Sequence, residues 1–272
     1  MRTRFAPSPT GHLHLGHAYS ALFAFDQARA AGGTFILRIE DLDPVRCRPE
    51  FVQSIYDDLE WLGLVWPRPV RIQSQHLPDY GAALARLDAL GLLYPCFCTR
   101  SDIAQSVSAP HGPEGQIYGG RCKHLSAAAV EERKAEGLPF ALRLHMDLAV
   151  RTAGPLVWTD RVQGEQIARP DLFGDVVLAR KDVPASYHLA VTVDDALQGI
   201  TLVTRGQDLF AASHVHRLLQ ALLGLATPLY HHHGLVTGPD GKRLAKRDRA
   251  QTLGFLRSQG YDAHDIRTMV GL

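Results

Sequence analysis

The sequence predicts an α/β protein built on a parallel sheet, with an inserted module in its middle and a short helical tail. Apolar strand-like runs alternate with helix-length stretches in the first third of the chain and again from Tyr187. Between these regions, segment 101–120 is rich in Ser, Gly, Pro and His and has no clear period. The 272 residues, 46% of them hydrophobic, are enough for one substantial core, alone or with an inserted module.

Local patterns predict the individual elements. Segment 34–39 (Thr-Phe-Ile-Leu-Arg-Ile) is β-rich and apolar, as expected of a buried parallel strand, and Gly32 and Gly33 end the helix before it. Apolar residues at helical spacing predict helices over 13–31, from 49 onward, over 79–90 and over 213–223, and a helical tail from 254. Strands are expected at 3–6, 34–39, 140–150, 156–162, 172–178, 189–193 and 200–203.

Composition excludes some classes of protein. The net charge of +1 neither indicates nor excludes a nucleic-acid binder, because a local basic face can lie on a neutral protein. No apolar run of about 18 residues is present, so no membrane span is expected. The N-terminus lacks the apolar region of a secretion signal, which favours the cytoplasm. No exposed apolar seam is evident, and a monomer is expected.

Two histidines mark the start of the first helix. His14, Gly16 and His17 lie where the first strand has turned into a helix, and a helix N-terminus favours phosphate. Gly16 would let a nucleotide approach the backbone closely, and the two histidines share one helical face. They could donate hydrogen bonds to triphosphate oxygens. Taken alone, a His-x-x-His pair is more often two ordinary polar residues.

A basic segment lies far downstream. The turn at 238–241 (Gly-Pro-Asp-Gly) precedes 242–247 (Lys-Arg-Leu-Ala-Lys-Arg). A glycine-hinged basic loop can close over a triphosphate and neutralise the departing pyrophosphate. Alone, this segment would be read as a solvated basic loop.

Taken together, five motifs resemble the glutamyl-tRNA synthetase family. They are Arg-Phe-Ala-Pro-Ser-Pro-Thr-Gly at 4–11, His-Leu-Gly-His at 14–17, Ile-Glu-Asp-Leu-Asp at 39–43, the block 187–209 with Asp194-Asp195 and Arg205-Gly206-Gln207-Asp208-Leu209, and the basic segment 243–247. Their order over about 250 residues makes the set far more specific than any fragment. The resemblance implies a class I synthetase fold with a Rossmann-like parallel sheet.

The resemblance ends soon after Arg247, where full glutamyl-tRNA synthetases continue into an anticodon-binding domain. This shortened form resembles the glutamyl-queuosine tRNA(Asp) synthetase family. That family activates L-glutamate with ATP without tRNA and transfers it to the queuosine base in the anticodon of tRNA(Asp). Mg²⁺ bound to ATP is implied.

The resemblance also implies site residues. The glutamate pocket would use Arg4, Ser8, Glu40, Tyr187 and Arg205, and the ATP site His14, Gly16, His17, His232 and Lys246. His14, His17 and Lys246 would act on the reacting phosphates. Guanidinium groups suit carboxylates and Glu40 suits an ammonium, but which arginine holds which carboxylate stays open. Ala245 and Arg243 depart from the usual Ser and Lys of the basic motif, which puts the contacts of this loop in doubt.

Three cysteines form a candidate structural zinc site. Cys96, Cys98, Tyr118 and Cys122 resemble the Cys-Cys-Tyr-Cys zinc site of some members of that family, and zinc in structural sites takes four ligands. His111 or His124 are chemically easier fourth ligands, and three thiols without metal are the simpler alternative.

The resemblance implies four segments. Residues 1–95 and 186–235 would be the two halves of the catalytic domain, 96–185 an inserted zinc-binding and stem-contact module, and 236–272 the basic loop and tail. Three other functions stay open: a shortened synthetase charging a tRNA 3′ end, a small-molecule nucleotidyltransferase, and an inactive tRNA-binding paralogue.

Overall fold

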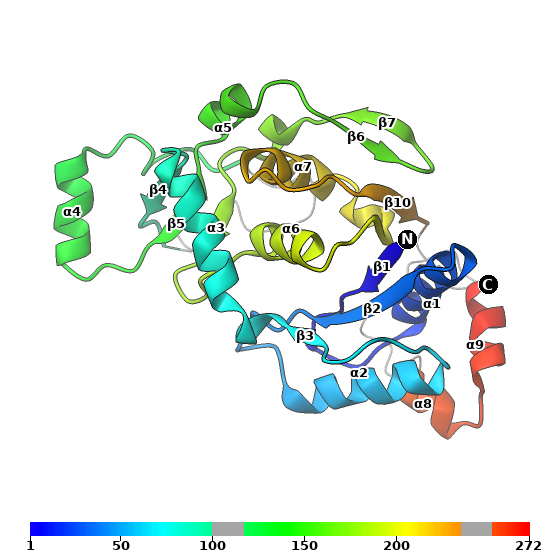
Figure 1. The fold of residues 1–272 in the computed structure, drawn as a ribbon. Coiled ribbons are helices and arrows are strands. Elements are labelled where there is room, and N and C mark those ends of the chain that lie inside the picture. The colour runs from blue at the N-terminus through cyan, green and yellow to red at the C-terminus, as the bar shows by residue number, and fades with distance from the viewer. Residues whose placement is uncertain (100–116, 235–251) are drawn as a thin grey trace.

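A computed structural model describes residues 1–99, 117–234 and 252–272 (Figure 1). The first parallel sheet has the order β1 (Arg2–Phe5), β2 (Thr34–Ile39) and β3 (Arg71–Ile72). Helix α1 (Leu15–Ala30) connects β1 to β2, and Arg4 pairs with Ile36 across them. The predicted strand 34–39 is confirmed.

A second sheet continues on the other side of β1. Its order is β7 (Gly164–Ile167), β6 (Val157–Asp160), β10 (Leu229–His233) and β9 (Leu202–Gly206), with only β7 antiparallel. Helix α7 (Ala212–Leu222) connects β9 to β10. The hairpin β6–β7 comes from segment 96–185, yet it pairs with β10 at Tyr230 and Asp160.

β1 and β9 meet at a junction between the two sheets. Thr201 N donates to Arg2 O at 3.0 Å, and Arg2 N donates to Thr201 Oγ1 at 2.8 Å. The chain leaves β1 toward β2 in one direction and leaves β9 toward β10 in the other. Ligands of open parallel sheets bind at the carboxyl ends of the strands at such a switch point. The fold therefore points to the ends of β1, β2 and β9 as the site.

Two large hydrophobic cores stabilise the fold, and a smaller one packs against the second sheet. One core is formed by α1, β1, β2, α2 (Pro49–Trp61), α8 (Leu253–Ser258) and α9 (Ala263–Val270). The other is formed by α3 (Leu77–Ala89), α5 (Met146–Ala153), α6 (Tyr187–Leu197) and α7, with strands of a third sheet. That sheet is antiparallel and has the order β4 (Leu93–Cys96), β5 (Ala141–Leu144) and β8 (Val177–Ala179). Helix α4 (Ala127–Ala135) projects beside it (Figure 1).

The predicted helices of the first third, the helix at 213–223 and the helical tail are confirmed. The strand predicted at 189–193 is wrong, because these residues belong to α6. Every residue from His188 to Asp195 is buried, and a short apolar run buried on all sides looks the same in a strand and a helix. The strand predicted at 140–150 is partly wrong, because β5 ends at Leu144 and α5 follows. Segment 172–178 contains the end of a 3₁₀ turn (Pro170–Phe173) and the start of β8.

Candidate active site

His14 and His17 form the first turn of α1. His14 is the N-cap, and its Nδ1 accepts a hydrogen bond from Gly16 N at 3.1 Å. His17 Nδ1 accepts from His14 N at 3.2 Å, and the two ring centroids lie 3.8 Å apart. Because each Nδ1 accepts, a neutral ring carries its proton on Nε2 and can donate there. The structure therefore brings two potential donors together at a helix N-terminus, where anions are favoured.

Gly16 has a local reason to be glycine. A Cβ at this position would lie 3.1 Å from Cε1 of His14, so a side chain would press on the ring that caps the helix. The glycine was predicted to give access for a nucleotide. Its observed contact is with the capping histidine.

The ends of the segment that carries Lys246 are both fixed beside α1. After the segment, Thr252 forms a bridge with His14, and Leu253 N donates to Leu13 O at 2.8 Å. Before it, Nε2 of His233 lies 3.2 Å from Ser20 Oγ. Lys246 itself lies outside the described residues, as do the other residues of the basic motif.

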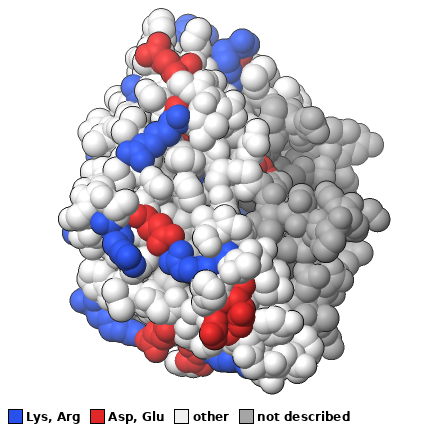
Figure 2. All heavy atoms as spheres, turned by 90° about the vertical axis from the view of Figure 1, so that its right-hand side faces the viewer, with Lys and Arg blue, Asp and Glu red and all other residues white. Residues whose placement is uncertain are grey.

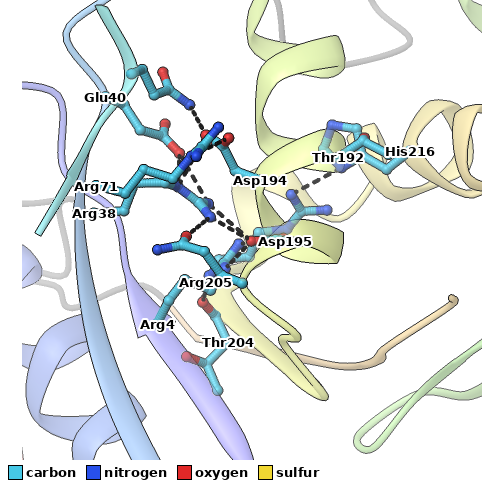
Figure 3. Close-up of polar contacts among 12 residues, drawn as sticks. Arg4, Arg38, Glu40, Arg71, Thr192, Asp194, Asp195, Thr204, Arg205 and His216 are labelled. Atoms are coloured by element: carbon cyan, nitrogen blue, oxygen red, sulfur yellow. Dashed lines mark hydrogen bonds and ion pairs between the residues drawn. The ribbon is translucent and has the colours of Figure 1, made fainter. Parts of the chain in front are cut away.

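A buried cluster of charges lies at the ends of β1 and β2 (Figure 3). Arg38 is fully buried and donates to Asp195 Oδ1 at 2.9 Å and to Glu40 Oε1 at 3.3 Å. Arg4 donates to the same Asp195 Oδ1 at 3.0 Å and to Thr204 O at 3.0 Å. Asp195, in α6, thus joins both arginines and lies between the two parts of the sheet.

The pKa shifts follow from this arrangement. Burial acts to raise the pKa of the Asp195 carboxyl, but Arg4 and Arg38 outweigh it and hold that pKa below its ordinary value. Burial raises the pKa of the Glu40 carboxyl, and Arg38 and Arg4 only partly oppose the rise. Glu40 is therefore the less satisfied carboxylate, and a further cation beside it would favour its charged form.

Asp194 is the carboxylate that joins the charged cluster to β3 and α3. Its carboxylate accepts from Arg71 Nε at 2.7 Å, from Gln73 Nε2 at 2.9 Å and from the Tyr80 hydroxyl at 3.0 Å. Arg38 Nε lies 3.7 Å away. Asp194 and Asp195 thus have different roles: one anchors β3 and α3, and the other faces the pocket arginines.

Arg205, at the end of β9, is a buried cation held by neutral groups. It is 5% exposed. It donates to Ser213 Oγ at 2.6 Å, to His232 Nε2 at 3.0 Å and to the Tyr187 hydroxyl at 3.3 Å, and its Nη1 lies 3.3 Å from His216 Nδ1. Within the described residues no carboxylate forms an ion pair with it. A buried cation without a counter-ion is expensive, so this site favours a ligand that brings a negative charge.

His232 holds Arg205 in place by accepting a hydrogen bond from it. Its ring is fully buried, with Nδ1 2.7 Å from Asp160 Oδ2. Burial and the charge of Arg205 lower the pKa of His232 to about 3, so the ring is neutral at neutral pH. Both ring nitrogens are engaged by Arg205 and Asp160, which leaves the side chain no nitrogen for the predicted contact with ATP.

The neighbouring histidines point the other way. The ring centroid of His231 lies 4.7 Å from that of Phe23, and the ring centroid of His233 lies 4.8 Å from that of Tyr19, so both pack on α1. The run 231–233 therefore does not gather around one point. Across the described ranges, the only cluster with metal-type ligands is formed by the cysteines considered below.

The remaining residues predicted to bind glutamate lie near the same charged cluster. Tyr187 is the first residue of α6, and burial raises the pKa of its hydroxyl. Ser8 is exposed in the turn after β1, and Glu40 N donates to Pro7 O at 3.0 Å, which holds this turn beside Glu40. The structure thus brings Arg4, Glu40, Tyr187 and Arg205 together from β1, the end of β2, α6 and β9, with Ser8 in the exposed turn nearby.

Sequence reasoning missed several residues of this site. Arg38, Asp160 and Ser213 each hold a predicted residue in place. A polar residue inside an apolar strand, as at Arg38, was the one available signal. The partners of Asp160 and Ser213 depend on tertiary contacts that no local pattern reveals.

The three cysteines form a second cluster, away from the pocket. Cys96, Cys98 and Cys122 are buried, and their sulfur atoms all lie within 4.8 Å of one another. The Tyr118 hydroxyl lies 3.4 Å from Cys96 Sγ and 3.5 Å from Cys98 Sγ. Three thiols and a phenol oxygen at such separations fit the four donors of a tetrahedral zinc site.

Neither histidine considered as a fourth zinc ligand belongs to the cysteine cluster that the structure describes. His124 is exposed and lies outside the cysteine cluster, and His111 lies outside the described residues. Arg143 is stacked on the ring of Tyr118, with Cζ 3.8 Å from its centroid. The geometry therefore favours Tyr118 over His124.

The charged side chains on one face of the molecule are of both signs. Figure 2 shows basic and acidic side chains interspersed on the face that forms the right-hand side of Figure 1. Among the described residues of that face, such mixing produces no strong field of one sign. No helix in the described ranges is long and apolar enough to cross a membrane.

Comparisons with known proteins identify the family of the chain. The family model described as tRNA synthetases class I (E and Q), catalytic domain, matches residues 1–272. The chain is 50% identical to a glutamyl-Q tRNA(Asp) synthetase of Rhodobacter capsulatus, with 100% of both chains covered. It is 42% identical to a glutamate–tRNA ligase 2 of Acidithiobacillus ferrooxidans, over 98% of this chain and 56% of the ligase.

A solved structure shows the same fold. The chain matches a glutamate tRNA ligase from Elizabethkingia meningosepticum, crystallised in complex with its amino acid, with a TM-score of 0.77 and 30% identity. The match covers 91% of this chain and 52% of that structure, so the chain spans about half its length. The chain is therefore an aminoacyl-tRNA synthetase-like ligase that belongs to the class I (E and Q) catalytic-domain family.

Proposed function

We propose that this chain activates L-glutamate with ATP and Mg²⁺, without tRNA, and transfers the glutamyl group to the queuosine base in the anticodon of tRNA(Asp). The observation that carries the proposal is a pair of groups that both interact with Tyr187: the buried Arg205, which has no carboxylate among its hydrogen-bond partners, and Glu40, a carboxylate whose pKa burial raises. Glutamate brings two carboxylates and one ammonium, which complement both groups.

Charge balance supports glutamate over a neutral amino acid. Arg4 and Arg38 form ion pairs with Asp195 and Glu40, whereas Arg205 has no carboxylate in direct contact among the described residues and is linked to Asp160 only through His232. Glutamate carries a net charge of −1 and glutamine carries none. We therefore assign one glutamate carboxylate to Arg205 and the ammonium to Glu40, with Arg4, Ser8 and Tyr187 completing the pocket.

Activation requires positioning and electrostatics rather than a covalent nucleophile. A glutamate carboxylate would attack the α-phosphate in line and displace pyrophosphate, giving glutamyl-adenylate. His14 and His17 would donate from Nε2 to phosphate oxygens at the N-terminus of α1. Lys246 would neutralise the departing pyrophosphate, since its segment begins and ends beside the same helix. Mg²⁺ bound with ATP would neutralise phosphate charge.

The residues assigned to the glutamate pocket already hold one another in place without tRNA, which supports activation that does not require tRNA. Arg205 already has its neutral partners in place, and Arg4 and Glu40 are already oriented by Asp195 and Arg38. The relative with full coverage of both chains is named glutamyl-Q tRNA(Asp) synthetase, which supports the tRNA(Asp) target.

We also propose a structural zinc ion held by Cys96, Cys98, Cys122 and Tyr118. Zinc would replace weak thiol contacts with four strong bonds and would stabilise the third sheet, where β4 ends at Cys96. This site would contribute stability and take no part in the chemistry of the pocket.

The test is glutamate-dependent ATP–pyrophosphate exchange, with and without tRNA, with glutamine and aspartate as controls. Labelled glutamate is then offered to tRNA(Asp) with and without queuosine. Exchange without tRNA and labelling of the queuosine form alone support the proposal.

A second candidate is a shortened glutamate–tRNA ligase, favoured by the 42% identity to a longer protein named glutamate–tRNA ligase 2. It predicts exchange only with tRNA and labelling of tRNA(Glu). Exchange with glutamine as efficient as with glutamate would contradict the assignment of Arg205.

A further inference from the structure

We propose that Asp160 is a positioning residue for amino-acid recognition that acts through His232 on Arg205. This inference rests on the proposed function, in which Arg205 binds a substrate carboxylate. Asp160 ends β6 and is buried, and it has no direct contact with Arg205 among the described hydrogen bonds.

Both oxygens of Asp160 face N–H groups. Oδ1 accepts from Val162 N at 2.9 Å and from Gln163 N at 3.0 Å, in the turn of the β6–β7 hairpin. Oδ2 accepts from His232 N at 3.0 Å and lies 2.7 Å from His232 Nδ1. Only a carboxylate can accept on both sides, because an amide would turn its NH₂ toward one pair of donors whichever way it is flipped.

The carboxylate therefore fixes the tautomer of His232. With its proton on Nδ1, the neutral ring presents the lone pair of Nε2 to Arg205 Nε, 3.0 Å away. The opposite tautomer would place a donor against a donor. Asp160 thus keeps His232 an acceptor that aims the guanidinium without adding a second charge beside it.

In the described part of the chain, Asp160 is the residue of the hairpin that forms hydrogen bonds with His232. β6 pairs with β10 in parallel register only at Asp160 and Tyr230, and Arg161 N donates to Tyr230 O at 2.8 Å. One carboxylate thus ties the hairpin turn and the pocket arginine together. The positioning residue comes from segment 96–185, outside the two halves that carry the sequence motifs.

The experiment compares Asp160→Ala, His232→Gln and the double variant in the exchange assay. Removing a hydrogen bond to a charged group predicts that Asp160→Ala raises the KM for glutamate at least about tenfold, with the KM for ATP unchanged. In His232→Gln the new amide carries an acceptor near the position of Nε2 that needs no tautomer. Adding Asp160→Ala to His232→Gln should therefore change that KM by less than about threefold.

Glu165→Gln, an exposed acid on β7 of the same hairpin, is the matched control and should leave both KM values unchanged. Asp160→Ala with the glutamate KM of the wild type, or with the same fold-change in both backgrounds, overturns the inference. If Asp160→Ala fails to fold, Asp160→Asn in the wild-type and His232→Gln backgrounds gives the same comparison.

A readout independent of activity separates this inference from the proposed function. Nitrogen-15 shifts of the His232 ring should report the proton on Nδ1 in the wild-type chain. A proton on Nε2 overturns the inference even if glutamate is activated. A wild-type chain that shows the Nδ1 tautomer but no exchange refutes the proposed function alone.

Discussion

Asp58, in α2, is a buried acid that the fold tolerates at a cost, and its replacement by asparagine should stabilise the protein. The residue is fully buried, and neither of its oxygens accepts a hydrogen bond of ordinary geometry among the described residues, although Ser54 is close enough to oppose the rise of its pKa. Its ion pair with Arg257 of α8 spans 3.5 Å. Burial raises the pKa of the Asp58 carboxyl to about 6, although Arg257 and His12 oppose the rise.

The sign and size of the effect follow from this shift. The folded-state pKa lies above the unfolded value, so ionisation of Asp58 costs nothing at low pH. It destabilises the protein increasingly as the pH rises from about 4 to about 6, and the cost is constant above that range. A pKa difference of roughly two between the folded and unfolded states corresponds to about 3 kcal/mol. Burying the amide of asparagine costs part of this gain. Asp58→Asn should therefore add about 2 kcal/mol to the free energy of unfolding at pH 8.

The assay is urea unfolding followed by tryptophan fluorescence at pH 8 and near pH 4.5, since the chain has three tryptophans. The gain should shrink by more than half at the lower pH. Asp57→Asn is the matched control, because this neighbour is exposed and should respond little at either pH. A loss of stability at pH 8, or a gain that does not change with pH, would refute the reasoning.

Three other predictions concern the pocket and the cysteines. Arg205→Ala should raise the KM for glutamate about a hundredfold or more while ATP binding persists, because the cation that matches a carboxylate is lost; unchanged exchange kinetics would remove the pocket assignment. Asp195→Asn should lower the free energy of unfolding, measured by urea unfolding, by about 3 to 5 kcal/mol, because it weakens the ion pairs with two buried arginines. A change below about 1 kcal/mol would contradict this. Cys98→Ser should lower the zinc content measured by elemental analysis, while Cys47→Ser should leave it unchanged; equal metal content in both variants would exclude the zinc site.

The sequence predicted those parts of the fold that local patterns decide. The strand at β2 and the helices α1, α2 and α7 follow from apolar periodicity and from end signals such as Gly32. The prediction failed at α6, where burial on all sides removed the periodicity. It also failed after Leu144, where a strand gives way to α5 within two residues.

The site divides in the same way. Arg4, Glu40, Tyr187 and Arg205 were identified from motifs, and the structure brings them together. The assignment of each charge to its partner could not be predicted, because Arg38 and Asp195 are 157 positions apart in the chain. Pairing over such a separation is decided by packing and not by local sequence.

The junction between β1 and β9 has a thermodynamic consequence for the whole chain. Arg4 lies in β1 and Glu40 directly follows β2 of the same sheet, whereas Tyr187 and Arg205 come from α6 and β9 on the other side. A ligand held by all four acts as a reversible cross-link, because the two sides cannot separate before it is released. At a hundred times its Kd such a ligand adds about 2.7 kcal/mol to stability by mass action. The amino acid would thus protect the junction between β1 and β9 against local opening. Proteases should therefore cut the ligand-free chain faster than the ligand-bound chain.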